Sequence, residues 1–323
     1  MKIFIDGREG TTGLQIQQRL EALQGELSTF AELPQATSRN VRSMELIILD
    51  EDKRKDVNAR REALQAADVA FLCLPDVAAR EAVALAENSE LLIIDASTAH
   101  RTTPGWAYGL PELSPAHREA VLTSNRIAVP GCHASGFCAL IYPLIANGIL
   151  DKNAALQCVS ITGYTGGGKA MIAEYENNRA TNDKLKAPRP YALELQHKHL
   201  PEIQAVCGLN APPWFMPVLG DFPQGLLVTV PLTPAQMTKS MALNDVRNFY
   251  EKYYELESII DVFPVSHGDD GGQLDPTIMA GNDGMEILTY GNDQHMMLAA
   301  RLDNLGKGAS GAAVQILKMR MGL

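Results

Sequence analysis

The stretch that decides the fold lies at the start of the chain: Ile3-Phe4-Ile5-Asp6-Gly7-Arg8-Glu9-Gly10-Thr11-Thr12-Gly13. Its first three residues predict a short buried strand, and apolar residues that recur on one face over 11–23 predict a helix. Glycines between strand and helix let the backbone turn tightly and approach a pyrophosphate at the positive helix N-terminus. The GxxGxxG spacing is a variant of the usual GxGxxG, so a plain strand-to-helix turn remains the alternative.

The first 130 residues repeat this alternation of apolar runs and helix-like stretches. Further strands are expected at residues 44–49, 68–74, 91–95 and 127–129. Continuous apolar strands separated by helices are typical of a parallel sheet that is covered on both faces. Residues 24–43 lack clear periodicity and contain a proline and several Ser and Thr residues, so we expect a surface connection there.

The pattern changes after Pro130. We expect a helix at residues 132–149, a polar helix near 238–256 and a closing helix at 308–321. Strands are expected at residues 157–162, 226–230, 285–290 and 296–302. Runs of strands separated by long loops predict an α+β domain with a mostly antiparallel sheet. The fold class is therefore α/β, a Rossmann-like parallel-sheet domain followed by an α+β substrate domain.

Composition excludes several functional classes. The 323 residues carry 38 acidic and 28 basic side chains, a net charge of −10, with no basic block. That balance argues against a surface for nucleic acid or anionic membranes, and no apolar run approaches the roughly 20 residues that span a bilayer. Five cysteines without a CxxC pair indicate neither a disulfide framework nor a structural zinc site. We expect a reduced, cytoplasmic, soluble enzyme.

Cys132 stands where the first domain is expected to end and a helix to begin. A thiol at a helix N-terminus experiences the helix dipole and free N–H groups, which lower its pKa and favour the nucleophilic thiolate. Other cysteines are placed differently: Cys73 and Cys158 lie inside predicted strands, and Cys138 lies within the helix. The alternative for any single cysteine is a small buried hydrophobic residue.

The segment around His197 and His199 is the candidate source of an acid/base. Pro201 suits the first turn of a helix, and Glu202 follows His199 by three residues, close enough to orient an imidazole if the turn is helical. A histidine oriented in this way is a plausible general acid/base. The His-x-His pair could also be half of a metal site, but the sequence offers no obvious third ligand and we expect no metal.

A second glycine-rich stretch nearly matches a P-loop: Gly163-Tyr164-Thr165-Gly166-Gly167-Gly168-Lys169-Ala170. Ala170 occupies the place where a Ser or Thr hydroxyl should hold Mg²⁺, so an ATPase is poorly supported. Gly166, Gly167 and Lys169 could instead bind a substrate phosphate through backbone amides and the ammonium group. The alternative is an irregular loop with a solvated lysine.

The end of the second predicted strand bears on the choice of cofactor. There the sequence reads Asp50-Glu51-Asp52-Lys53-Arg54-Lys55. An acidic residue at this place favours a ribose hydroxyl, whereas the Lys/Arg cluster suits a 2′-phosphate. The charges conflict, and we favour NADP over NAD.

The sequence resembles the N-acetyl-gamma-glutamyl-phosphate reductases of arginine biosynthesis, in particular their short form. The resemblance spans nearly the whole chain and rests on motifs that occur in the family's order. These are the opening strand and glycine turn, residues 72–76 (LCLPD), 95–101 (DASTAHR), 108–112 (YGLPE), 130–132 (PGC), 197–203 (HKHLPEI), 220–225 (GDFPQG) and 303–315 (DNLGKGASGAAVQ). His133 and Ala134 differ from the aromatic and small residues that more commonly follow the cysteine.

The resemblance implies roles for individual residues. Cys132 would be the nucleophile, with the acid/base from His197 or His199, where Glu202 favours His199. The residues implied in cofactor binding are Gly7, Gly10, Thr11, Thr12, Gly13, Ser97, Arg101, Asn304 and Gly308. The closing helix would return to the first domain, so residues 1–130 with 305–323 would bind dinucleotide and 131–304 would carry substrate and oligomer contacts.

The implied reaction is reduction of an acyl phosphate, N-acetyl-gamma-glutamyl phosphate, to its semialdehyde by NADPH through a cysteine thioester. A homo-oligomer, dimer or tetramer, is expected. Alternatives are a reductase of another acyl phosphate, such as aspartyl or carrier-linked aminoadipyl phosphate, and a P-loop-like phosphotransferase. A dinucleotide sensor without catalysis is a further alternative.

Overall fold

The structure, a computed structural model, describes residues 1–31, 43–265 and 272–323. The chain divides into two compact units, and each is described by itself. The first unit comprises Met1–Gly109, Glu119–Val129 and Ser310–Leu323. The second comprises Leu110–Arg118 and Pro130–Ala309.

The first unit is built on a six-stranded sheet in the order β2-β1-β3-β4-β6-β5. Every neighbouring pair in this sheet is parallel, which confirms the predicted parallel sheet. Its strands are β1 (Lys2–Asp6), β2 (Glu45–Ile47), β3 (Val69–Leu72), β4 (Leu92–Asp95), β5 (Ala107–Tyr108) and β6 (Arg126–Ala128). The short edge strand β5 was not expected from the sequence, because its two residues are too few to show a pattern.

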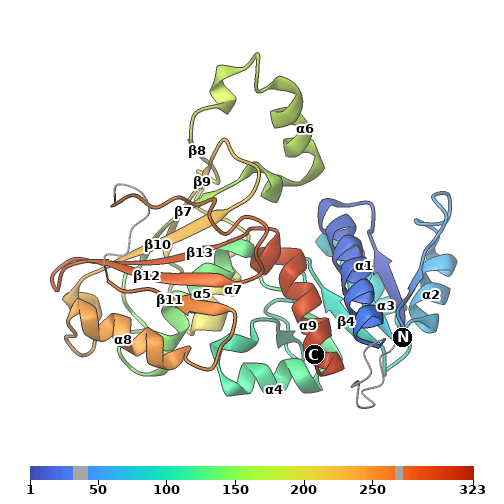
Figure 1. Cartoon of the computed structure of the whole chain (residues 1–323), viewed down its shortest axis with the longest axis horizontal. Helices are drawn as coiled ribbons and strands as arrows, with labels where there is room; N and C mark the ends of the chain where they lie inside the picture. Colours follow the sequence, from blue (N-terminus) through green and yellow to red (C-terminus); the bar gives the residue numbers. More distant parts are fainter. Residues whose placement is uncertain (32–42, 266–271) are drawn as a thin grey trace. The chain divides into compact units, whose positions relative to one another are not determined.

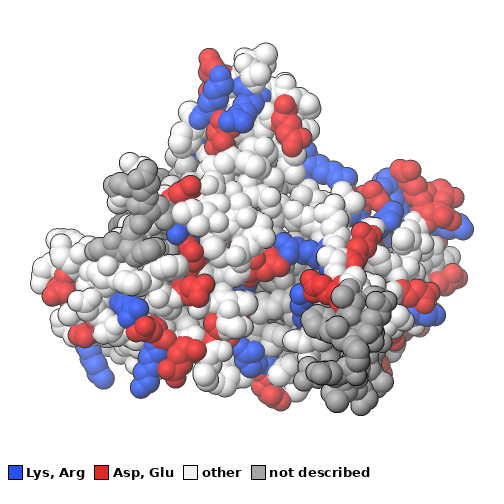
Figure 2. All heavy atoms as spheres, in the orientation of Figure 1, with Lys and Arg blue, Asp and Glu red and all other residues white. Residues whose placement is uncertain are grey.

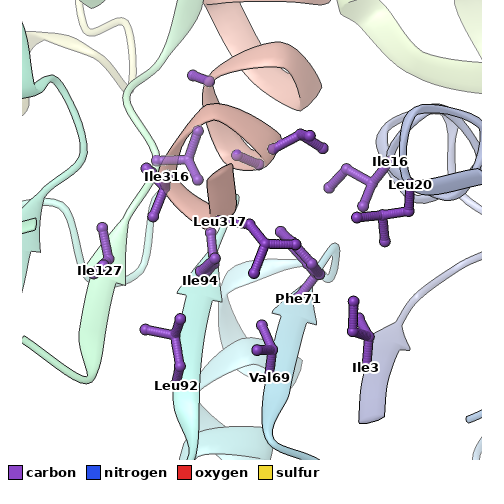
Figure 3. Close-up of a cluster of buried hydrophobic side chains, with 14 of the residues drawn as sticks. Ile3, Ile16, Leu20, Val69, Phe71, Leu92, Ile94, Ile127, Ile316 and Leu317 are labelled. Carbon is purple, nitrogen blue, oxygen red and sulfur yellow. The ribbon is translucent and has the colours of Figure 1, made fainter. Parts of the chain in front are cut away.

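Helices cover both faces of this sheet. α1 (Thr11–Ala31) and α9 (Gly311–Met321) share one hydrophobic cluster with the sheet, while α2 (Val57–Ala66) and α3 (Asp76–Leu85) share another. Figure 3 shows the first cluster, in which side chains of α1 and α9 meet those of the strands. The labelled members of that cluster are Ile3, Ile16, Leu20, Val69, Phe71, Leu92, Ile94, Ile127, Ile316 and Leu317. Burial on both faces explains why the strands are almost continuously apolar.

The surface connection expected at residues 24–43 is wrong over its first part. Helix α1 continues to Ala31, and Leu23 and Leu27 are buried. Together with Leu20 they extend the apolar stripe at spacings of three and four, which a surface loop would not bury. Residues 32–42 of that expected connection lie outside the described residues.

The second unit is built on a seven-stranded sheet in the order β11-β12-β13-β10-β7-β9-β8. Four of its six neighbouring pairs are antiparallel, and only β11 with β12 and β7 with β9 are parallel. The mostly antiparallel sheet is therefore confirmed. Its strands are β7 (Gln157–Thr162), β8 (Arg189–Pro190), β9 (Trp214–Leu219), β10 (Leu226–Leu232), β11 (Ile260–Val262), β12 (Met285–Gly291) and β13 (Met296–Leu302).

The long buried helix of this unit, α5 (Cys132–Ala146), packs on β10 and β13. Gly136 permits the close approach, because a Cβ there would lie 2.7 Å from Cγ2 of Val228. The other helices of this unit are α6 (Gly168–Asn178), α7 (Leu200–Cys207) and α8 (Leu243–Tyr253) (Figure 1). Helix α4 (Pro115–Thr123) begins in this unit, and its residues from Glu119 onward are assigned to the first. The α5, α8 and α9 helices are shorter than expected. α9 begins only at Gly311, because residues Gly306–Ser310 form a π-helical turn.

Charged side chains of both signs are interspersed over the face drawn in Figure 2. None of the described helices is long and apolar enough to cross a membrane.

Candidate active site

The glycine turn after β1 requires glycine at two positions. Gly7 has φ +84°, and a Cβ there would lie 2.3 Å from the carbonyl oxygen of Cys73. A Cβ at Gly13 would lie 2.6 Å from the carbonyl oxygen of Gly7. The Gly10 N–H donates to that same Gly7 oxygen, at 3.0 Å, and helix α1 begins at Thr11. The turn therefore presents bare backbone at a helix N-terminus, which is the arrangement that binds a phosphate anion.

A cavity of about 650 Å³ opens beside this turn, within the first unit. Its volume lies in the range of small-molecule sites. The apolar part of its lining includes Ile47, Leu49, Leu74 and Pro75. The charged part consists of Asp6, Arg8, Glu9, Glu51, Arg54, Lys55, Arg60 and Glu81. Apolar walls and basic groups at one cavity fit a phosphorylated nucleoside, so the residues present are compatible with a dinucleotide.

Asp6 and Arg60 form a buried ion pair at this cavity. Nε and Nη2 of Arg60 donate to Oδ2 of Asp6 at 3.0 and 2.8 Å. Burial raises the pKa of Asp6, and the opposing influence of Arg60 does not fully offset it. The pair holds the end of β1, directly before Gly7, against helix α2.

Ser97 and Arg101 lie in the loop that follows β4. The Ser97 hydroxyl donates to Oδ2 of Asp95 at 2.7 Å, and Nδ1 of His100 lies 2.6 Å from the same oxygen. Arg101 donates through Nε to the Val129 carbonyl at 2.9 Å. This loop is thus fixed by its own polar side chains within the first unit.

Cys132 is the first residue of α5 and is half-buried. The N–H of the preceding Gly131 donates to Oε1 of Glu202 at 2.9 Å, and Glu202 is buried in the first turn of α7. That Glu202 orients His199 stays a prediction. Its Oε1 holds the backbone directly before Cys132, and so ties the starts of α5 and α7 together.

His199 precedes α7 as its N-cap residue, and Pro201 lies in the first turn as predicted. The His199 N–H donates to Nδ1 of His197 at 3.2 Å, and the two ring centroids lie 4.7 Å apart. His199 is buried, whereas His197 is half-buried. The ring of His133, the residue that directly follows Cys132, has its centroid 5.5 Å from the ring centroid of each of them, so three imidazoles form one cluster.

His133 has two polar partners that the sequence analysis did not identify. Its Nδ1 lies 2.7 Å from Oγ of Ser160, and its Nε2 lies 2.9 Å from the hydroxyl of Tyr191. Burial lowers the pKa of His133 to about 3, and the positive charges of His197 and Lys198 act in the same direction. Burial raises the pKa of Tyr191, as does the negative charge of Cys132. Both groups are therefore neutral near pH 7.

These contacts were missed because their partners are far apart in the sequence. Ser160 comes from β7, and Tyr191 follows β8, so no local spacing links either to His133. The one available signal was the position of a histidine directly after the candidate nucleophile.

The π-helical turn brings Gly308 against the cysteine. A Cβ at Gly308 would lie 2.6 Å from Cβ of Cys132. Within the same turn Lys307 is fully buried, and its Nζ donates to Oε1 of buried Glu112 at 2.8 Å. A π-helical turn is rare and frequently occurs at functional sites.

Asn304 connects this region to the second glycine-rich stretch. Its Oδ1 accepts from the Gly225 N–H at 2.9 Å, and its Nδ2 donates to Oγ1 of Thr165 at 3.0 Å. Gly166 and Gly167 are exposed in a short helical turn. Asn304 and Gly308 thus belong to the second unit, whereas the other expected cofactor residues belong to the first.

Lys169 is exposed in the first turn of α6. Residue 170, in the same turn, is alanine and has no hydroxyl that could hold a metal ion. Among the described residues, no group of three or more His, Cys, Asp or Glu side chains is arranged to hold a metal.

Comparison with known proteins assigns both parts of the chain. Residues 2–121 match the family model described as the NAD binding domain of semialdehyde dehydrogenase, and residues 132–304 match the model of its dimerisation domain. The solved structure of aspartate semialdehyde dehydrogenase II from Vibrio cholerae superposes with a TM-score of 0.69 at 18% identity, covering 98% of this chain and 97% of that one. The fold and the site define the class, the oxidoreductases of the semialdehyde dehydrogenase type.

Closer relatives identify the group within that class. The chain is 40% identical over 330 residues to N-acetyl-gamma-glutamyl-phosphate reductase 2 of a Nostoc species, covering 100% of this chain and 97% of the relative. It is 41% identical over 325 residues to the N-acetyl-gamma-glutamyl-phosphate reductase of Brucella suis, covering 99% of each. The chain belongs to the N-acetyl-gamma-glutamyl-phosphate reductase family, which confirms the resemblance seen in the sequence.

Proposed function

We propose that this chain reduces N-acetyl-gamma-glutamyl phosphate to N-acetyl-glutamate 5-semialdehyde with NADPH, releasing phosphate, as a step of arginine biosynthesis. The observation that carries the proposal is the arrangement at Cys132, the first residue of α5. Glu202 holds the backbone before it, and His197 and His199 directly precede helix α7, whose first turn contains Glu202. Relatives about 40% identical over the whole chain carry the name of this activity.

Cys132 acts as the nucleophile. Its thiolate attacks the acyl carbon and expels phosphate, so that a carbon–sulfur bond replaces the carbon–oxygen bond of the mixed anhydride. Backbone N–H groups at the start of α5 can stabilise the negative oxygen that forms, and one such donor contributes typically about 2.7–4 kcal/mol. Collapse of the reduced intermediate expels the sulfur again and frees the aldehyde.

His199 is the proposed acid/base, with His197 beside it. An imidazole can take up and return a proton near neutral pH, which suits a group that protonates a departing oxygen or sulfur. The backbone N–H of His199 donates to Nδ1 of His197, so the neutral ring of His197 carries its proton on Nε2. His199 is itself buried, and the ring beside it has a defined tautomer. Glu202 serves by holding the backbone before the nucleophile.

The first unit would hold the cofactor. Gly7, Gly10, Thr11, Thr12 and Gly13 would bind the pyrophosphate at the start of α1. The apolar walls of the cavity suit an adenine, and Arg54 and Lys55 suit a 2′-phosphate, which favours NADP. When bound, NADPH supplies the hydride that reduces the acyl carbon.

Seven further residues complete the proposed contacts, four with the cofactor and three with the phosphate. Ser97 and Arg101 of the first unit and Asn304 and Gly308 of the second are assigned to the cofactor. Gly166, Gly167 and Lys169 would hold the departing phosphate through exposed amides and an ammonium group. We further propose that residues 1–130 with 305–323 bind dinucleotide and that residues 131–304 carry the acyl chemistry, with Asn304 contributing to the cofactor site from the end of that range.

The reverse reaction tests this function. Purified enzyme is given NADP and N-acetyl-glutamate semialdehyde with and without phosphate, alongside aspartate semialdehyde, and NADPH formation is followed. We expect phosphate-dependent turnover of the acetylated aldehyde and none of the aspartate compound. Turnover of aspartate semialdehyde alone would move the substrate to another acyl phosphate, and turnover of neither would overturn the proposed activity.

The enzyme is proposed to be a homo-oligomer, a dimer or tetramer, that pairs through the outer face of the seven-stranded sheet. On β9 the side chains alternate, with Trp214 and Met216 67% and 46% exposed while Phe215 is buried. Light scattering on the wild type and on Met216→Arg tests this, because a charge on a buried apolar contact should dissociate the pair. A cytoplasmic location is also proposed, supported by five cysteines that are all free thiols.

A further inference from the structure

We propose that Cys138 and Cys207 are a modification site, at which a hydroperoxide such as hydrogen peroxide forms a reversible disulfide between helices α5 and α7. Cys138 lies within α5, and Cys207 is the last residue of α7. The chemistry proposed above uses neither thiol. The site therefore goes beyond the proposed function and does not depend on it.

The two sulfur atoms are already in contact. The thiol of Cys207 donates to Sγ of Cys138, and the two sulfurs lie 3.7 Å apart. The residues are 69 positions apart in the chain, so the packing of α7 against α5 brings them together. A disulfide holds its sulfurs about 2.05 Å apart, so the two atoms must approach each other by about 1.7 Å.

Position in the two helices determines which thiol reacts first. Cys138 is 0% exposed in the interior of the buried helix α5, whereas Cys207 is 2% exposed at a helix end. Gly208 follows it and ends α7 with φ +66°. Helix ends open more readily than helix interiors. Opening of the last turn of α7 therefore exposes Cys207 to peroxide while Cys138 stays in the core.

The reaction has two steps and consumes one molecule of peroxide. The Cys207 thiolate attacks the O–O bond, an S–O bond forms, and the departing hydroxide takes up the thiol proton as water. The sulfur loses two electrons and the peroxide gains them, which leaves a sulfenic acid.

The second step closes the disulfide. Sγ of Cys138 attacks the sulfenic sulfur, an S–S bond forms, the S–O bond breaks, and the departing hydroxide takes up the Cys138 proton as a second water. Because the second thiol lies at contact distance, it captures the sulfenic acid before further oxidation.

The disulfide adds a second link between two helices that already share one. Oε1 of Glu202, in the first turn of α7, accepts from the Gly131 N–H directly before α5. The sulfur pair lies at the opposite end of α7. With both ends tied to the α5 segment, α7 resists local opening. Disulfides in a reducing compartment are usually transient, so this link is a reversible clamp that closes under oxidising conditions.

Mass spectrometry of the full chain tests the site. The parent variant is Cys132→Ser, because the half-buried Cys132 would otherwise be oxidised as well. Hydrogen peroxide at about pH 8.5, where a thiol is partly ionised, should lower the intact mass by about 2 Da, and dithiothreitol should restore it. The tryptic peptides 127–152 and 199–239 should be joined until reductant is added.

Substitution of either cysteine should abolish the mass loss and the cross-link. The matched control is Cys158→Ala, which removes another buried thiol of the second unit, from β7, and should leave both unchanged. If Cys138→Ala does not fold, Cys207→Ala at the helix end provides the same test. An unchanged mass, a gain of oxygen without a cross-link, or a cross-link between other cysteines would each overturn the proposal.

Urea unfolding and hydrogen exchange test the clamp. Because the disulfide closes a long loop, the urea midpoint of the oxidised parent should rise by roughly 1 M and fall back on reduction. Amides in the last turn of α7 should exchange more slowly after oxidation, and Cys207→Ala should show neither change. Equal midpoints and equal exchange in the two redox states would refute the clamp. None of these measurements uses substrate or cofactor, so they stay separate from failure of the reverse reaction.

Discussion

The buried ion pair of Lys307 and Glu112 gives the sharpest prediction about stability. The two side chains are 0% and 1% exposed, and Nζ lies 2.8 Å from Oε1. Replacing Lys307 with Met would remove the cation while its carboxylate partner stays beyond the reach of water. Removing one member of a buried pair typically costs about 3–5 kcal/mol.

The double substitution Lys307→Met with Glu112→Leu separates this electrostatic penalty from lost packing. Because both charges disappear together, the double variant should recover most of the loss, as apolar replacements of buried pairs often do. The matched control is Lys186→Met, whose partner Asp183 is 90% exposed. That surface pair should contribute no more than about 1 kcal/mol.

Urea unfolding at pH 7.5 and pH 5.5 measures these free energies. The single variant should lose less stability at pH 5.5, because a buried carboxyl that has lost its cation is relieved by binding a proton. A loss below about 1 kcal/mol in Lys307→Met, or a double variant as unstable as the single one, would refute the reasoning. Since the π-helical turn places Gly308 against Cys132, alkylation of the cysteine should slow in the single variant and recover in the double one.

Four further predictions follow from the site. Cys132→Ser should lower kcat by roughly 10³-fold or more with an unchanged melting temperature, and near-normal turnover would exclude the thioester. His133, with its pKa lowered to about 3, is neutral in the folded protein but binds a proton when unfolded below pH 6.5, so stability is lost as pH falls. Between pH 7 and 5.5 the wild type should lose about 1.3 kcal/mol that His133→Gln retains, measured by urea titration. Gly7→Ala should abolish NADPH binding in a fluorescence titration, because φ is +84° and a Cβ would meet the Cys73 carbonyl. Arg54→Ala and Lys55→Ala should each raise the KM for NADPH several-fold and leave that for NADH unchanged; an equal effect on both would remove the 2′-phosphate assignment.

Features fixed by neighbouring residues could be predicted from the sequence. The strand, glycine turn and helix at residues 3–23 depend on local periodicity and on the backbone freedom of Gly7. The order of residues in the sequence shows both features directly. The place of Cys132 at a helix start follows from Pro130-Gly131 and the apolar run after it. Residues 24–31 were misassigned because Gly25 and several polar side chains mask the buried Leu27, which tertiary packing holds in the helix.

Contacts between distant elements could not be predicted in the same way. The sequence offered only a nearby imidazole as a partner for Glu202, and could not show that its Oε1 accepts from the Gly131 N–H, 71 residues away. Strand β9 escaped notice because Trp214 and Met216 make its outer face apolar as well, which removes the alternation that marks a half-buried strand. The network of His133, Ser160 and Tyr191 depends on the pairing of β9 with both β7 and β8, which no local spacing encodes.

The chemistry of the second unit gathers where two helices begin. α5 starts at Cys132 and α7 at Leu200, and each helix start carries a partial positive charge. Such a field favours a thiolate and disfavours a protonated histidine, so by itself it would separate the nucleophile from its acid. Glu202 offsets this, because one buried carboxylate accepts an N–H at the start of α5 while it lies in the first turn of α7. This one side chain thus joins the two helix starts at which the proposed function places the nucleophile and the acid/base.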